Sequence, residues 1–222
     1  RAATLDVTDA GAVQAAVGDG VGRAGRLDLM FNNAGIVWGG ETELLTLDQW
    51  NAIIDINLRG VVHGVVAAYP QMLRQGDGHI INTASMAGLA AGGQLTSYVA
   101  TKHAVVGLSM ALRSEAVPRG VGVLVVCPAA VETPILDKGA VGSFGGRDYF
   151  LKTQGGKAYD ADQLARDILR AIERNKAILV KPTVAHAQWL FARLAPVMMN
   201  RLSMRFTSPQ AKRSPSRAVD SG

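Results

Sequence analysis

A run of apolar residues in the second half of the chain places the strongest constraint on its fold. Residues 121–127 read Val-Gly-Val-Leu-Val-Val-Cys, and Pro128 ends the run. A strand that is apolar on both faces is typical of a parallel sheet covered by helices on either side. The run therefore predicts a buried central strand, which requires neighbouring strands and two layers of helices.

Short apolar segments alternate with helical patterns along the rest of the chain. We expect further strands at residues 5–7, 27–31, 79–83 and 177–180. We expect helices over residues 8–25, 46–73, 96–117 and from 160 or 162 onward, with Thr8 and Thr46 as the first two N-caps. Alternation of this kind is typical of a doubly wound parallel sheet. The predicted fold is a three-layer α/β/α domain over residues 1–183.

The composition narrows the class of protein. The chain has 222 residues, of which 18% are charged, 25 are glycine and one is cysteine, Cys127. The charged fraction excludes wholesale disorder, and a single cysteine excludes a disulfide framework or a cysteine-rich metal site. The histidines lack the spacing of metal ligands, so we expect no metal: His63, His79, His103 and His186. The sequence has no run of eighteen apolar residues and no apolar signal core, which favours a cytoplasmic globular protein.

The formal charge of +5 is concentrated at the carboxyl end of the chain. From Lys181 onward there are seven basic residues and one acidic residue, whereas the preceding 180 residues hold 16 basic and 17 acidic residues. We divide this end into an apolar and basic helical element over 184–207 and a basic tail over 208–222. Pro196 is expected to kink or split the helical element. The Ser, Pro, Lys and Arg residues of the tail predict disorder.

Two interpretations of the 184–207 element stay open. An apolar helix with interspersed arginines can lie on an anionic membrane surface, which would make the protein peripheral to a membrane. The element can also pack on its own subunit or on a second subunit, and we favour this packing role. Charge alone would allow the tail to contact nucleic acid. No nucleic-acid-binding motif accompanies the charge, so we expect no nucleic-acid partner.

Gly20, Gly22 and Gly25 fit the G-x-G-x-x-G spacing of a dinucleotide-binding loop. That loop must follow a strand and open a helix, so that backbone N–H groups face the pyrophosphate. Here the glycines close a predicted helix and lead into a strand. We therefore expect no phosphate loop at this position.

A tyrosine and a lysine four residues apart carry a stronger signal. Tyr98 and Lys102 share one face of a predicted helix. A phenol with a pKa near ~10 is a poor base at neutral pH, and a nearby ammonium lowers that pKa. Ser85 lies 13 residues before Tyr98, at the carboxyl edge where open α/β sheets bind ligands. Taken alone, each of these residues is weak evidence, and so is Asn57 within its predicted helix.

Taken together, these residues resemble the short-chain dehydrogenase/reductase family. The resemblance rests on four segments that follow the family's order: Asn32-Asn33-Ala34-Gly35, Asn57-Leu58-Arg59-Gly60, Ser85 with Tyr98-x-x-x-Lys102, and Pro128-x-x-Val131-x-Thr133. It covers about residues 4–181. It implies a Rossmann-type fold and an NAD(P)-dependent oxidoreductase.

The resemblance also implies a role for each matched residue. Tyr98 would exchange a proton with the substrate oxygen, and Ser85 would hold that oxygen. Lys102 would lower the pKa of the tyrosine and bind the nicotinamide ribose, and Asn57 would organise a water relay to the lysine. The expected catalytic set is Asn57, Ser85, Tyr98 and Lys102, while NAD or NADP carries the hydride.

The resemblance further implies the contacts to cofactor and substrate. Besides Tyr98 and Lys102, the expected cofactor contacts are Asp6, Val7, Asn33, Ala34, Gly35, Pro128, Val131 and Thr133. Position 129 holds alanine where the family usually has glycine, a small departure. The expected substrate contacts are apolar, although several could serve only for packing: Trp38, Met86, Leu95, Ile135, Leu136 and Phe144. We therefore expect a hydrophobic secondary alcohol or ketone as substrate of a homo-oligomer, either a dimer or a tetramer.

One motif of the family has no counterpart in the sequence. The family begins with a strand, a glycine-rich phosphate turn (Thr-Gly-x-x-x-Gly-x-Gly) and a second β–α unit before the strand matched by residues 5–7. We therefore expect an N-terminally incomplete domain, either part of a longer protein or a truncated product. The alternative function is a non-catalytic Rossmann-fold binding or interaction protein. The choice between NAD and NADP stays open, because the discriminating residue lies in the absent region.

Overall fold

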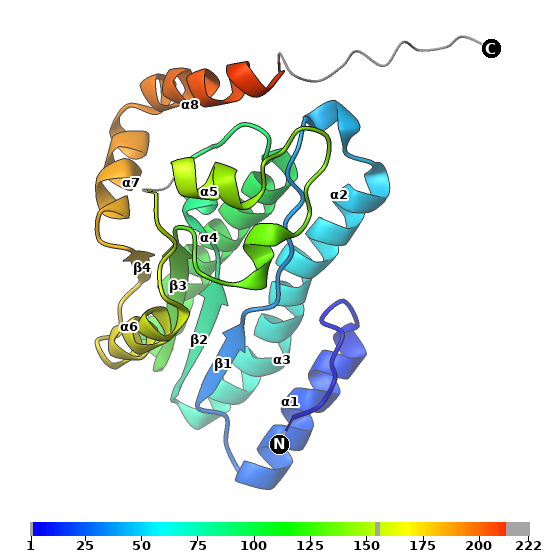
Figure 1. The fold of residues 1–222 in the computed structure, drawn as a ribbon. Helices are drawn as coiled ribbons and strands as arrows, with labels where there is room; N and C mark the ends of the chain where they lie inside the picture. The colour runs from blue at the N-terminus through cyan, green and yellow to red at the C-terminus, as the bar shows by residue number, and fades with distance from the viewer. Residues whose placement is uncertain (1, 154–155, 212–222) are drawn as a thin grey trace, which may run out of the picture.

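The computed structural model describes residues 2–153 and 156–211 and contains one parallel sheet (Figure 1). The strands are β1 (Leu29–Asn32), β2 (Gly78–Thr83), β3 (Val121–Pro128) and β4 (Ile178–Lys181). Their order in the sheet is β1-β2-β3-β4, and every neighbouring pair is parallel. The apolar run at 121–127 is indeed a strand with every residue buried. The predicted parallel α/β class is therefore confirmed.

Helices connect the strands. They are α1 (Ala10–Ala24), α2 (Leu47–Ile54), α3 (Gly60–Gln75), α4 (Thr96–Ala116), α5 (Arg147–Thr153), α6 (Ala161–Glu173), α7 (Ala185–Leu194) and α8 (Pro196–Ala211). A π-helical turn, η2 (Asp55–Arg59), joins α2 to α3. Short 3-10 turns lie at η1 (Thr42–Leu44), η3 (Met86–Gly88), η4 (Val117–Arg119) and η5 (Pro134–Asp137). Thr46 caps α2 with a complete capping box, as the sequence predicts.

Alternate residues of the central strands face opposite helix layers. Ile80 and Val123 belong to a core cluster with residues of α3 and α4. Ile81 and Leu124, one position further along, pack with α6. Because side chains of a strand alternate between the two faces of a sheet, this pattern requires apolar residues at consecutive positions. The expected three-layer arrangement of helices about the sheet follows.

The continuous helix Leu47–Gln75 is long and apolar enough to cross a membrane, judged by length and composition alone. Ile53, Val61, Ala68 and Met72 on this helix are nevertheless buried among the core clusters. A helix that packs against a sheet needs such an apolar face in any case. Its composition is thus accounted for by its place in the domain.

The predicted strand at residues 5–7 is wrong, and so is the N-cap expected at Thr8. Residues 5–7 lie beside α3, where the Val7 carbonyl oxygen and His63 Nδ1 are 2.9 Å apart. An extended segment becomes a strand only where another strand pairs with its backbone, and none of the described residues does so here. Asp9, rather than Thr8, caps α1 and accepts a hydrogen bond from the backbone of Ala12. Thr8 instead donates from its backbone and hydroxyl to Asp6.

The glycines that imitate a dinucleotide loop close α1, as predicted. Gly20 and Gly22 lie within the helix, and Gly25 caps it with a left-handed φ of 77°. Gly25 donates its backbone N–H to the Val21 carbonyl, so that backbone donor is already used. The helix dipole at this end is negative and repels a phosphate. The structure therefore excludes a phosphate loop at this position.

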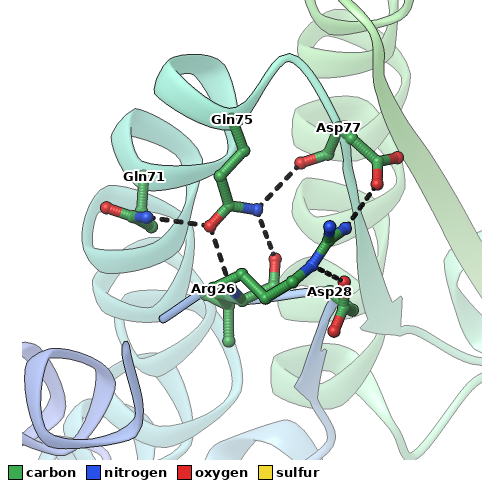
Figure 2. A network of polar contacts seen from close by, with 6 residues as sticks. Arg26, Asp28, Gln71, Gln75 and Asp77 are labelled. Carbon is green, nitrogen blue, oxygen red and sulfur yellow. Dashed lines mark hydrogen bonds and ion pairs between the residues drawn. The ribbon is translucent and has the colours of Figure 1, made fainter. Parts of the chain in front are cut away.

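A polar network holds the segment that leads into β1 against the carboxyl end of α3 (Figure 2). Gln75 bridges the backbone of Leu27, accepting from its N–H at 2.9 Å and donating to its carbonyl at 3.0 Å. Arg26 contacts Asp28 at 2.5 Å and Asp77 at 2.6 Å. These ion pairs are exposed and contribute little free energy. The amide bridge of Gln75 satisfies backbone groups and sets where the strand starts.

Pro196 splits the carboxyl-terminal helix, as expected. α7 ends at Leu194 and α8 begins at Pro196, where the missing N–H of proline costs no hydrogen bond. α8 continues to Ala211, so residues 208–211 are helical although the sequence predicts disorder. The rest of that predicted tail, residues 212–222, lies outside the described residues.

The close approach of α3 to β1 predicts a large effect of a single methyl group. A Cβ added to buried Gly64 would lie 1.8 Å from Asn32 Oδ1 and 2.9 Å from Met30 Cε. We expect Gly64→Ala to lower the free energy of unfolding by about 1–3 kcal/mol, because the overpacked helix must move. Urea denaturation followed by circular dichroism measures this change.

Gly107 provides the matched control. It also lies within a helix, α4, but a Cβ there meets nothing within 4 Å. Gly107→Ala should therefore stabilise the protein by up to about 1 kcal/mol through helix propensity. Equal effects of the two substitutions would contradict the close packing of α3 on β1.

Candidate active site

A cavity of about 330 Å³ lies at the carboxyl ends of the parallel strands. Thr83 ends β2 and Pro128 ends β3, and both line this cavity. Three of the predicted catalytic side chains line it as well: Ser85, Tyr98 and Lys102. The structure therefore brings together residues from a strand end, a turn and a helix at the edge where α/β sheets bind ligands.

Tyr98 and Lys102 lie on one face of α4 and are both buried. The Lys102 Nζ atom is 5.6 Å from the centre of the Tyr98 ring. It also donates a hydrogen bond of 2.8 Å to the Thr83 carbonyl. An ammonium has three donors, so this bond leaves donor capacity for a ligand in the cavity.

Burial governs the protonation of this pair. It lowers the pKa of Lys102 to about 8, because a desolvated ammonium is unfavourable. Burial also raises the pKa of Tyr98, and the hydrogen bond with Ser85 acts in the opposite direction. The lowering of this pKa by Lys102, which the family resemblance implies, stays a prediction. At neutral pH the phenol keeps its proton and can donate it.

Ser85 begins the turn η3 and accepts a backbone hydrogen bond of 3.1 Å from Ala87. Its hydroxyl therefore holds the backbone of this turn, and the residue lines the same cavity as Tyr98. Cys127 lies nearby at the end of β3 and is fully buried, and its burial raises the pKa of the thiol to about 12. A buried thiol that stays protonated serves as a core residue and not as a nucleophile.

Asn57 lies in the π-helical turn η2 and is fully buried. Its amide accepts from the Ile36 N–H at 2.8 Å and donates to the Ile36 carbonyl at 2.9 Å. The extra residue of a π-turn rotates a side chain out of the ordinary helical register. Asn57 therefore fixes the loop after β1 next to Lys102, but it does not line the cavity.

Gly35 lies between the amide of Asn57 and the amine of Lys102. A Cβ added at Gly35 would be 3.4 Å from Asn57 Oδ1 and 3.5 Å from Lys102 Nζ. These are ordinary contact distances, so the loop that contains Gly35 passes close to both polar groups.

The residues expected to contact the cofactor fall into two neighbouring cavities. The main cavity is lined by Asn33, Gly35, Pro128, Val131 and Thr133. A smaller cavity of about 170 Å³ is lined by Val7 and Ala34, and Asn33 lines both cavities. Asp6 lines neither of them, and its exposed carboxylate accepts hydrogen bonds from Thr8. Its predicted adenine contact stays a prediction.

The residues expected to contact substrate are not gathered in one place. Ile135 and Leu136 line the main cavity, whereas Met86 and Leu95 line a separate apolar cavity. Trp38 lines a third hollow with Ile135. Phe144 packs against Tyr149 at a ring distance of 5.0 Å and lines none of these cavities. The predicted substrate contact of Phe144 stays a prediction.

Sequence reasoning missed Thr83 and Thr101. The Thr83 carbonyl accepts from Lys102, and its hydroxyl donates to Asn33 Oδ1 at 2.9 Å. Thr101 Oγ1 is 3.4 Å from Asn57 Nδ2. The position of Thr83 at the end of a strand, two residues before Ser85, is the signal that could have found it. Thr101 has no signal in the sequence, because its contact depends on how two helices pack.

Among residues 2–153 and 156–211, no group of three or more His, Cys, Asp or Glu side chains is placed to hold a metal ion. The acceptors and donors around the cavity are hydroxyl, amide, amine and backbone groups. Such a set suits an organic ligand with hydroxyl and carboxamide groups.

A comparison of the chain with known protein families identifies the family to which it belongs. Residues 1–140 match the family model described as short chain dehydrogenase. The chain belongs to the short-chain dehydrogenase family. Among solved structures, a short-chain dehydrogenase from Streptomyces avermitilis has a TM-score of 0.78 at 27% identity, covering 95% of this chain and 80% of that chain.

Relatives of this chain are named for different activities. A cyclohexanol dehydrogenase of an Acinetobacter species is 40% identical over 127 residues, which are 56% of this chain and 50% of that protein. A 3-oxoacyl-(acyl-carrier-protein) reductase of Staphylococcus aureus is 37% identical over 132 residues, which are 60% of this chain and 54% of that protein. The chain thus spans about half the length of these relatives.

Because its amine is buried, we expect Lys102 to lower the free energy of unfolding at neutral pH. The unfolded chain keeps this proton up to a pKa near ~10.4, whereas the folded chain releases it near a pKa of about 8. Lys102→Met should therefore raise the free energy of unfolding at pH 7 by up to about 3 kcal/mol, less the lost bond to Thr83. Urea denaturation of both proteins measures the difference.

The pH dependence separates this effect from ordinary packing. Between pH 8 and pH 10 the unfolded chain binds more protons at residue 102 than the folded chain does, so the parent gains stability as pH rises. The advantage of Lys102→Met should shrink over that range. A pH-independent difference, or a less stable variant at pH 7, would contradict the assignment.

Proposed function

We propose that the complete protein is an NAD(P)-dependent oxidoreductase that interconverts a hydrophobic secondary alcohol and its ketone. The observation that carries this proposal is the meeting of Ser85, Tyr98 and Lys102 in one cavity at the carboxyl edge of the sheet. A phenol, a hydroxyl and an amine in a desolvated site suit proton transfer to and from a carbonyl oxygen. Membership of the family supports the same reaction class.

Ser85, Tyr98 and Lys102 have different roles at the substrate oxygen. The Ser85 hydroxyl and the Tyr98 phenol both reach the cavity and can donate hydrogen bonds to a carbonyl oxygen there. Tyr98 transfers its proton to that oxygen during reduction and takes it back during oxidation. The raised pKa of Tyr98 keeps the proton available at neutral pH. Lys102 stabilises the phenolate that is left after the transfer.

The cofactor would lie along the same edge. NAD or NADP, when bound, supplies or accepts the hydride. The Lys102 amine is 3% exposed with donors to spare, and it fits a ribose hydroxyl. Val131 and Thr133 line the opposite side, where a carboxamide can be held. Asn33 and Ala34 lie towards the smaller cavity and suit the rest of the dinucleotide.

The apolar lining supports a hydrophobic substrate. Val37, Ile135, Leu136 and Phe150 line the main cavity beside Ser85 and Tyr98. The two relatives described above are named a cyclohexanol dehydrogenase and a 3-oxoacyl-(acyl-carrier-protein) reductase. Both substrates combine an apolar portion with an alcohol or ketone. We infer a substrate of the same general kind for this protein.

Replacing the tyrosine tests the proposed chemistry. In the complete protein, Tyr98→Phe should lower kcat at least 100-fold, since general acid–base catalysis contributes about 10²–10⁴. The dissociation constant of the cofactor should change less than threefold, because the ribose is held by Lys102. Steady-state kinetics of ketone reduction and a fluorescence titration with NADH and NADPH measure the two quantities.

Tyr69→Phe is the matched control for this substitution. Tyr69 lies on α3 and packs beside the core cluster of Ala68 and Met72, away from the cavity. This control should leave kcat within twofold. Undiminished kcat in Tyr98→Phe would overturn the proposed role of the phenol.

The alternative of a non-catalytic binding protein has a separate test. The 222 residues contain no Thr-Gly-x-x-x-Gly-x-Gly turn, and the Gly20–Gly25 segment closes a helix. Without such a turn the pyrophosphate finds no helix N-terminus. We therefore expect calorimetric titration of the 222-residue chain to give no micromolar binding of NAD or NADP. Micromolar binding would contradict this expectation and favour a self-sufficient cofactor site.

Assembly and location stay predictions. We infer a cytoplasmic homo-oligomer, either a dimer or a tetramer. Light scattering on the eluting protein reports the number of subunits directly.

A further inference from the structure

The segment that leaves β3 forms one wall of the main cavity. Residues 129–133 follow Pro128, the last residue of the strand. Four residues of this segment line the cavity: Ala129, Ala130, Val131 and Thr133. The proposed function places the carboxamide of the cofactor against this segment. Whatever holds the segment in place therefore bears on cofactor binding.

The end of β4 holds the start of the 129–133 segment. The Ala129 N–H donates a hydrogen bond of 2.7 Å to the Lys181 carbonyl. This bond continues the parallel pairing of β3 with β4 beyond Pro128. The backbone of Lys181 therefore fixes the point at which the segment turns away from the sheet.

Tyr159 holds the middle of the same segment. Its backbone forms a parallel bridge with Val131. The Tyr159 N–H donates to the Ala130 carbonyl at 2.7 Å, and the Tyr159 carbonyl accepts from the Glu132 N–H at 2.9 Å. A residue that lies 27 positions further along the chain thus satisfies polar backbone groups on either side of Val131.

The side chains of Tyr159 and Lys181 meet on one carboxylate. The Tyr159 hydroxyl donates to Asp167 Oδ2 at 2.7 Å, and the Lys181 Nζ atom lies 3.0 Å from the same oxygen. Asp167 lies on α6, which packs beside β4 (Figure 1). Contacts therefore run in a closed ring from the 129–133 segment through Lys181, Asp167 and Tyr159 and back to the segment. We call this arrangement the Asp167 ring.

Burial makes the carboxylate of Asp167 a demanding partner. The residue is 8% exposed, and a buried carboxylate is unfavourable unless donors surround it. Burial alone would raise the pKa of Asp167, but the hydrogen bonds from Tyr159 and Lys181 outweigh burial and lower this pKa. Arg170 adds a longer ion pair at 3.6 Å. Asp167 is therefore charged at neutral pH, and charge-assisted hydrogen bonds of this kind are short and directional.

Asp167 can act on the main cavity only through its neighbours. It does not line that cavity, whereas Leu164, three residues earlier on α6, does. Tyr159 and Lys181 do not line the cavity either. The ring thus lies behind the 129–133 segment and supports it.

We propose that Asp167 is a positioning residue that holds the 129–133 segment in its cofactor-binding conformation through Tyr159 and Lys181. This inference rests on the proposed function, because it assumes that the segment contacts NAD or NADP. A segment that is already ordered loses less conformational entropy when a ligand binds. The ring therefore acts on cofactor affinity, while the proton transfer at Tyr98 and the affinity for the ketone do not depend on it.

Two substitutions open the ring, and each has a matched control. Tyr159→Phe removes only the hydroxyl that reaches Asp167, and Asp167→Asn removes the charge that holds Lys181. Asp162→Asn removes the same charge from an exposed position in the first turn of the same helix. Tyr69→Phe removes a hydroxyl from the core beside α3.

Hydrogen–deuterium exchange of the 222-residue chain measures the order of the segment without any cofactor. In Tyr159→Phe and Asp167→Asn, peptides that cover residues 129–133 should exchange about tenfold faster than in the parent, because the Glu132 N–H loses a fixed acceptor. Peptides that cover residues 121–127 of β3 should exchange as in the parent. Both control variants should match the parent in both sets of peptides.

Cofactor affinity in the complete protein gives the second readout. The dissociation constants of NADH and NADPH, measured by fluorescence titration, should rise about fivefold or more in Tyr159→Phe and Asp167→Asn. The KM for the ketone should change less than twofold. A structural loss that spreads through the domain would raise both quantities together, so this split identifies positioning.

Unchanged exchange of residues 129–133 in both ring variants would overturn the inference. An equal increase over residues 121–127 would overturn it as well, because Asp167 would then stabilise the domain as a whole. Because exchange is measured without cofactor or turnover, the expected exchange in a complete protein that is inactive contradicts the proposed function alone. Unchanged exchange and unchanged cofactor affinity in an active protein contradict the Asp167 ring alone.

Discussion

The parallel pairing of β2 with β3, buried on both faces, is the interaction on which the candidate site depends. The register pairs Ile81 with Leu124 and Thr83 with Val126, so both strands end at the same edge of the sheet. Helices on either side remove these strands from water and supply most of the apolar burial. The carboxyl ends of the strands then expose backbone carbonyls at a defined edge. The Thr83 carbonyl that holds Lys102 is one of them.

The burial that stabilises the sheet also makes the polar candidate site unfavourable for the stability of the fold. The amine of Lys102 and the phenol of Tyr98 lie where water is excluded, and their pKa values move in the directions that neutralise them. A site of this kind is less stable than an apolar core of the same shape. The surrounding sheet and helices offset that cost, and the desolvated groups interact more strongly with a bound ligand.

Close contacts between helices and strands position the remaining polar groups. Gly64 lets α3 approach β1, and Asn32 in turn donates 2.8 Å to Asn82 within the sheet. The π-turn after α2 carries Asn57 to the backbone of Ile36. Together these contacts hold the loop that contains Gly35 beside Lys102. The chain arranges this geometry without a metal cluster among its described residues.

The amino-acid sequence by itself determined the class of fold and indicated the candidate catalytic side chains that the structure brings to one cavity. The apolar run at 121–127 required a covered parallel sheet, and the spacing of Tyr98 and Lys102 required one helix face, because both depend on local periodicity. The GxGxxG segment was also correctly excluded, since its place at the end of a helix is a local property. Local signals misplaced residues 5–7, because a strand needs a partner that no local pattern reports.

Only the tertiary structure decided how the remaining residues share the space. Ser85 and Met86 are neighbours in sequence but line different cavities, and Phe144 packs against Tyr149 of α5. The contribution of α7 and α8 to the wall of the separate apolar cavity was equally invisible, because apolar residues on a helix read the same whether they meet a core, a ligand or a second subunit. The direction in which the pKa of Tyr98 shifts likewise depends on burial. Solvent exclusion is a property of the assembled domain, and it arises from contacts between segments that lie far apart in the chain.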